Sequence, residues 1–107
     1  MEEYKEEDLA FEIILHAGNA KSLCMEALEA SREKDFEKMD RLFTEASEEL
    51  RLAHSCQTDV LRKSLMNSDV RIGMLMIHAQ DHVMNAITIN DLTREIARLS
   101  RDKENNK

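Results

Sequence analysis

The chain has 107 residues, of which 42% are hydrophobic and 35% charged, so it holds enough apolar material for a single packed domain over residues 1–107. It has two glycines and no proline, which excludes turn-rich sandwiches, barrels and doubly wound sheets as well as Gly-rich phosphate-binding loops. The formal net charge of −7 argues against a nucleic-acid-binding protein. The chain has no apolar run of membrane-spanning length, and its N-terminus is acidic where a secretory signal would be basic. We therefore expect an all-helical cytoplasmic protein.

The first predicted helix runs from about Glu7 to Arg32. Apolar residues recur at alternating spacings of four and three, the period of one helix face. Most of them are small, which predicts that a neighbouring helix packs closely against this one. They are Ile13, Ala17, Ala20, Cys24 and Ala27.

The second predicted helix follows a polar stretch that ends at Asp35, whose side chain is suited to cap it. The expected core seam is Phe36, Met39, Phe43, Ala46, Leu50, Ala53, Gln57 and Val60.

The third predicted helix begins near Val70 and ends near Ser100. The break before it is 67–69, with Ser68 or Asp69 as the cap, and the polar residues 101–107 after it are expected to form a frayed tail. Three long helices joined by short turns must run up, down and up. The predicted fold is an antiparallel three-helix bundle.

The third helix has two apolar faces, although a three-helix bundle needs only one. A second face predicts that this helix also packs against copies of itself, and the alternative is a wide buried stripe in a monomer. One face is Met74, Ile77, Asp81, Met84 and Thr88, and the other is Ile72, Leu75, Ala79, Val83, Ala86 and Ile87.

Asp81 lies in the middle of the first face, where an unpaired carboxylate is costly to bury. Copies that meet on a symmetry axis could share a divalent cation or a proton through Asp81. An ion pair with a Lys or Arg of another helix explains the residue equally well.

His78 and His82 are four residues apart on one helix face, with Asp81 between them. They have three interpretations: ordinary polar helix residues, a phosphoryl-accepting imidazole with its neighbour, or a transition-metal site. A hydrolytic zinc helix would carry Glu at the position of Ala79. Of the other candidates, His16 and His54 are interpreted as ordinary helix residues. Cys24 and Cys56 are interpreted as buried reduced thiols.

The run HAQDHVMNAITINDL from His78 to Leu92 resembles the signature of the lactose/cellobiose-type enzyme IIA proteins of the bacterial sugar phosphotransferase system. The resemblance covers most of the chain. HAGNAKSLCMEAL, within 14–28, is similar to the family's first helix, and 35–57, together with the adjoining Cys56-Gln57-Thr58 region, is similar to its second.

The resemblance implies a homotrimer of three-helix bundles, a nine-helix assembly. It implies that His78 is transiently phosphorylated and that Gln80 and His82 orient the phosphoryl group. It also implies that Asp81 lies at the trimer axis and binds a divalent cation, with Mg²⁺ as the expected ion. No organic cofactor is expected.

The implied function is that of a phosphocarrier. His78 accepts the group from the general histidine phosphocarrier protein and passes it to a cysteine of enzyme IIB during uptake of a disaccharide such as lactose, cellobiose or chitobiose. The alternative is a non-catalytic helical interaction protein in which His78, Asp81 and His82 form a structural metal or polar layer.

Overall fold

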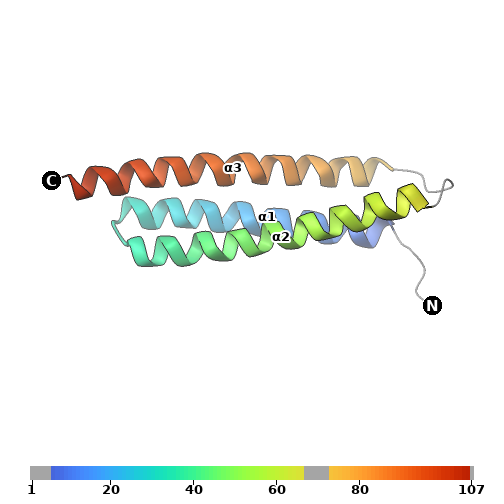
Figure 1. Cartoon of the computed structure of the whole chain (residues 1–107), viewed down its shortest axis with the longest axis horizontal. Coiled ribbons are helices and arrows are strands. Elements are labelled where there is room, and N and C mark those ends of the chain that lie inside the picture. Colours follow the sequence, from blue (N-terminus) through green and yellow to red (C-terminus); the bar gives the residue numbers. More distant parts are fainter. Residues whose placement is uncertain (1–5, 67–72, 107) are drawn as a thin grey trace.

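The computed structural model describes residues 6–66 and 73–106, which form three helices and no strand. They are α1 (Glu6–Arg32), α2 (Phe36–Met66) and α3 (Met74–Asn105). Helices α1 and α3 run in the same direction and α2 runs against them (Figure 1), so the predicted up-down-up bundle is confirmed. The predicted break at 67–69, its cap and Ile72 lie outside the described residues.

The turn between α1 and α2 follows directly from its sequence. Lys34 takes a left-handed backbone conformation, with φ of 64°. This lets the Asp35 N–H donate to the carbonyl of Ala30 at 2.9 Å, the reversal that commonly ends a helix. The Asp35 side chain then accepts from the backbone N–H of Lys38 at 3.2 Å, which confirms the predicted cap.

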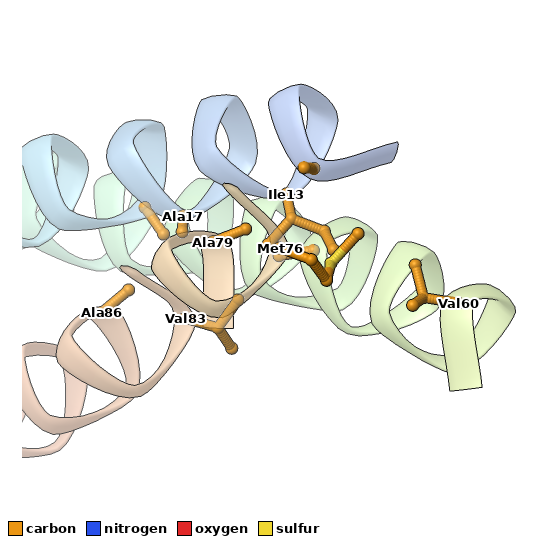
Figure 2. Packing of buried hydrophobic residues seen from close by; sticks show 10 residues of the cluster. Ile13, Ala17, Val60, Met76, Ala79, Val83 and Ala86 are labelled. Atoms are coloured by element: carbon orange, nitrogen blue, oxygen red, sulfur yellow. The ribbon is translucent and has the colours of Figure 1, made fainter. Parts of the chain in front are cut away.

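The core is built around α1, which packs along both other helices, whereas α2 and α3 contact each other much less. The small residues predicted on α1 are all buried, and this allows the close approach. Figure 2 shows the part of the core nearest the start of α3, where Ile13 and Ala17 meet Met76, Ala79 and Val83.

Two arginines of α3 bridge the wider seam to α2. The Arg94 guanidinium lies 4.6 Å from the Phe43 ring centroid and donates to the Phe43 carbonyl at 2.8 Å and to the Ser47 hydroxyl at 2.6 Å. Arg101 lies 5.1 Å from the Phe36 ring centroid. Stacking and charge-assisted hydrogen bonds therefore add to the apolar packing along this part of the seam.

Both predicted ends of α3 are wrong. The helix begins at Met74, after Gly73 in extended conformation, rather than near Val70. It continues past Ser100 to Asn105, so the expected frayed tail is helical up to that residue. The added turn is held by contacts from outside α3: Arg101 donates to Asp40 at 2.9 Å, and Lys34 pairs with Glu104 at 3.2 Å.

None of the helices in the described part of the chain has a stretch both long and apolar enough to cross a membrane.

Candidate functional site

The two predicted faces of α3 are both present, but Ile87, predicted on the face of Ala86, is 41% exposed because it lies one residue, about 100°, around the helix from Ala86. Ala79, Val83 and Ala86 are buried against the rest of the bundle. The opposite side remains exposed in the single chain, which excludes the wide buried stripe as an explanation. We call this side the outward stripe of α3, made of Met74, Ile77, Asp81, Met84, Leu92, Ile96 and Leu99. The exposed fractions of its apolar members range from 50% to 82%.

Asp81 lies on the outward stripe between Ile77 and Met84 and is exposed in the single chain. No Lys or Arg within residues 6–66 and 73–106 forms an ion pair with its carboxylate. The ion-pair explanation of Asp81 is therefore not what this chain displays. In the single chain its carboxylate lies on an exposed apolar surface.

His78 and His82 are brought together by one turn of α3. Their Nε2 atoms lie 3.1 Å apart, within hydrogen-bond distance, and their rings meet edge to face with centroids 4.6 Å apart. The His78 side chain is exposed and that of His82 is half-buried. His78 is thus an exposed side chain with one ring nitrogen next to a hydrogen-bond partner.

Gln80 is not beside His78 in the single chain. Two residues along a helix correspond to a rotation of about 200°, so the two side chains lie on opposite flanks of the outward stripe. The Gln80 carbonyl oxygen accepts a hydrogen bond from the side-chain amide of Gln57 on α2. The Gln80 amide nitrogen lies 3.6 Å from the sulfur of Met76.

A groove of about 310 Å³ lies between α2 and α3 next to this pair of glutamines. Its walls are mainly apolar. The lining residues are His54, Gln57, Thr58, Val60, Leu61, Met76 and Gln80. Gln57 was predicted as a member of the core seam, and the periodicity gave no sign that its amide would meet Gln80.

Other polar residues have partners that sequence spacing could not indicate. His16, interpreted from the sequence as an ordinary helix residue, contacts Glu49 of α2 with Nδ1 and Oε2 2.6 Å apart. Both cysteines are free, as expected, but only Cys24 is fully buried. Cys56 is half-buried and donates to Glu12 at 3.4 Å; burial, and then this carboxylate, raise the pKa of the thiol to about 11.

The described residues hold no group of three or more His, Cys, Asp and Glu side chains placed to bind a metal ion. A transition-metal site made by His78, Asp81 and His82 within one chain is therefore not present. Asp81 offers a single carboxylate per chain.

The chain as a whole matches a known family of phosphotransferase components. Residues 8–101 match the model of the PTS system, lactose/cellobiose specific IIA subunit. The lichenan-specific phosphotransferase enzyme IIA component of Bacillus subtilis is 41% identical over 87% of this chain and 84% of that protein. The lactose-specific EIIA component of Staphylococcus epidermidis is 37% identical over 85% and 88%.

Solved structures show the same fold. The cellobiose-specific enzyme IIA of Bacillus anthracis superposes with a TM-score of 0.89 at 33% identity, covering 98% of this chain and 97% of that one. PtcA of S. mutans gives 0.84 at 38% identity over 94% and 99%. The chain belongs to the lactose/cellobiose-specific enzyme IIA family, and it is a phosphotransferase component with a phosphocarrier role in sugar uptake.

Proposed function

We propose that His78 is the residue that carries the phosphoryl group. The observation that carries this proposal is the exposed His78 imidazole, whose Nε2 lies 3.1 Å from Nε2 of His82. When the His82 nitrogen donates, the His78 nitrogen keeps its lone pair and its own proton is on Nδ1. The lone pair becomes the nucleophile when this hydrogen bond opens as the donor protein docks, and the His78 side chain is exposed, as transfer between two proteins requires.

On loading, the N–P bond of the donor's phosphohistidine breaks while a bond forms between phosphorus and His78 Nε2. On unloading, that bond breaks as a cysteine sulfur of enzyme IIB takes the group. The donor is the general histidine phosphocarrier protein. Such transfers depend on in-line positioning and charge stabilisation. Once the group is attached, the His82 N–H turns from the His78 nitrogen to a phosphoryl oxygen.

The functional unit is a homotrimer formed through the outward stripe of α3. Apolar residues extend along nearly the whole helix on this side, a larger exposed surface than a monomer usually keeps. Three parallel copies of α3, the number implied by the family resemblance, would bury it along a common axis. The trimer acts in the cytoplasm, where it carries phosphoryl groups for the uptake of a disaccharide.

Assembly also explains why Gln80 and His78 point apart. When the outward stripe lies on the axis, the His78 flank of one copy faces the Gln80 flank of the next. Each phosphoryl group would then lie between His78 and His82 of one protomer and Gln80 of its neighbour. The site is complete only in the assembly.

The same geometry brings the Asp81 carboxylates together on the axis. One exposed carboxylate binds a cation only weakly, but three carboxylates with water would supply the oxygen ligands and octahedral geometry that Mg²⁺ prefers. A bound cation would supply charge neutralisation between the copies. The chain's own part is to hold Asp81 between Ile77 and Met84, where no Lys or Arg of the described residues forms an ion pair with it.

The test is phosphorylation of the intact protein with the upstream phosphocarrier system, followed by mass measurement. We expect one phosphate per wild-type chain and none in His78→Gln, with helix content and assembly unchanged because an exposed helical side chain contributes little to packing. His54→Gln, a change of the same type at an exposed helical histidine, should leave phosphorylation intact. A phosphate retained by His78→Gln would show that another residue is the carrier.

A further inference from the structure

The contact between Gln57 and Gln80 has no role in the function proposed above. It joins α2 to α3 across the mainly apolar groove, and both side chains are half-buried. A glutamine side chain has one acceptor, the oxygen, and one NH₂ group with two donors. Its effect on a nearby anion therefore depends on which end of the amide faces that anion.

The partners of Gln80 determine this orientation. Its oxygen accepts from the Gln57 amide, so the oxygen is turned toward α2. Its nitrogen lies 3.6 Å from the Met76 sulfur, a weak acceptor that leaves most of the donor capacity of the NH₂ group unused. The group left to meet a ligand at this flank of α3 is thus the donor.

We propose that Gln57 is a positioning residue for phosphoryl transfer. By holding the Gln80 oxygen it fixes the Gln80 NH₂ group as a donor to the phosphoryl group on His78 of the neighbouring protomer. This inference rests on the proposed function, since it takes Gln80 to be part of the phosphoryl site. Gln57 itself does not touch the phosphoryl group.

The orientation matters because the phosphoryl group is anionic. A donor stabilises its oxygens through a charge-assisted hydrogen bond, whereas an amide oxygen in the same place repels them. An amide free to rotate would present both ends. Gln57 removes this freedom before the phosphoryl group arrives, so no reorientation is required during transfer.

The decisive variant is Gln57→Glu, which keeps the size of the side chain but cannot donate. A glutamate there accepts from the Gln80 NH₂ group and turns the Gln80 oxygen outward. We expect the rate of phosphoryl transfer from the loaded trimer to enzyme IIB to fall about tenfold, the effect of losing a hydrogen bond to a charged group. The side-chain ¹⁵N–¹H signals of Gln80, identified by their loss in Gln80→Ala, should shift in the same variant.

The matched control is Thr58→Val, the next residue on α2. Thr58 also lines the groove, but its hydroxyl donates to the His54 backbone carbonyl at 3.0 Å. The transfer rate and the Gln80 signals should be unchanged in this variant.

A double-mutant cycle separates positioning from a general structural effect. If Gln57 acts only through Gln80, Gln57→Glu has no further effect on transfer in a Gln80→Ala background. A full tenfold loss in that background, or wild-type transfer by Gln57→Glu alone, would overturn the inference. Neither result alters the phosphate on His78, whereas an unphosphorylated wild-type chain would refute the proposed function instead.

Discussion

The seam between α2 and α3 is built differently at its two ends. At one, the arginine end, Arg94 and Arg101 stack on Phe43 and Phe36 and donate to α2. At the other, the site end, the helices flank the 310 Å³ groove, and the glutamine pair crosses between them. The strongest contacts between α2 and α3 thus lie far from His78. Beside the site the two helices leave a groove, which is crossed by the contact that orients the Gln80 side chain.

One cysteine lies at each of these two ends of the bundle, and the largest expected effect concerns their reactivity. Below pH 9, a rise of the Cys56 thiol pKa from 9.0 to about 11 lowers the thiolate fraction about 100-fold. Native Cys56 at the site end should react with iodoacetamide about 100-fold more slowly than an unperturbed thiol at pH 8, and faster as the pH rises toward 11. Peptide mass analysis over time measures both cysteines.

Glu12→Gln should speed alkylation of Cys56, because it removes the carboxylate that, together with burial, raises the thiol pKa. Cys24 belongs to the buried cluster at the arginine end and is 0% exposed. It should react only when the bundle opens, at a rate that Glu12→Gln does not change. Faster alkylation of Cys24 than of Cys56 in the native protein would contradict the comparison.

The second effect is on stability at the arginine end. Arg94→Met keeps much of the apolar stem but removes the stacking on Phe43 and the hydrogen bonds to α2, so we expect a loss of about 2 kcal/mol in the free energy of unfolding. Arg98→Met is the matched control, since the Arg98 side chain is 66% exposed and its ion pair within the described part of the chain is with Glu95 of the same helix. A loss of about 0.5 kcal/mol or less is expected. Urea unfolding at equal protomer concentration measures both. Equal losses in the free energy of unfolding for the two variants would mean that the contacts of Arg94 with α2 do not stabilise the bundle.

The smallest expected effect is at the outward stripe. Asp81→Leu removes a charge and adds apolar surface, and such replacements at buried ionic positions are often neutral or stabilising. We expect a trimer with an equal or higher melting temperature and no response to a chelator. Asp81→Asn, which removes the charge but not the polarity, should melt no higher than Asp81→Leu.

Thermal melts with and without chelator, together with analytical ultracentrifugation, test this prediction. Dissociation of Asp81→Leu into monomers would show that Asp81 holds a specific partner rather than a shared ion.

Sequence periodicity predicted what is local to each helix. The start of α1 lies one residue from the prediction, at Glu6 instead of Glu7, and the Asp35 cap was correct. The two faces of α3 were correct except for Ile87, which is exposed. Contacts between helices were missed, including Gln57 with Gln80 and His16 with Glu49. They depend on the rotation and offset of one helix against another, which the spacing within a helix does not encode. The C-terminal end of α3 was misplaced for the same reason. Its last turns are stabilised by Asp40 of α2 and by Lys34 in the turn between α1 and α2.

The dominance of α1 in the core has a consequence for the order of folding. The hairpin of α1 and α2 closes through a short turn and buries small residues along its length, so its contacts cost little loop-closure entropy. Helix α3 packs mainly on α1, from which it is separated in the sequence by the whole of α2, so its contacts close a longer loop. We expect the hairpin to form first and α3 to dock onto it afterwards. The helix that carries His78 would thus be the last to fold and the first to detach.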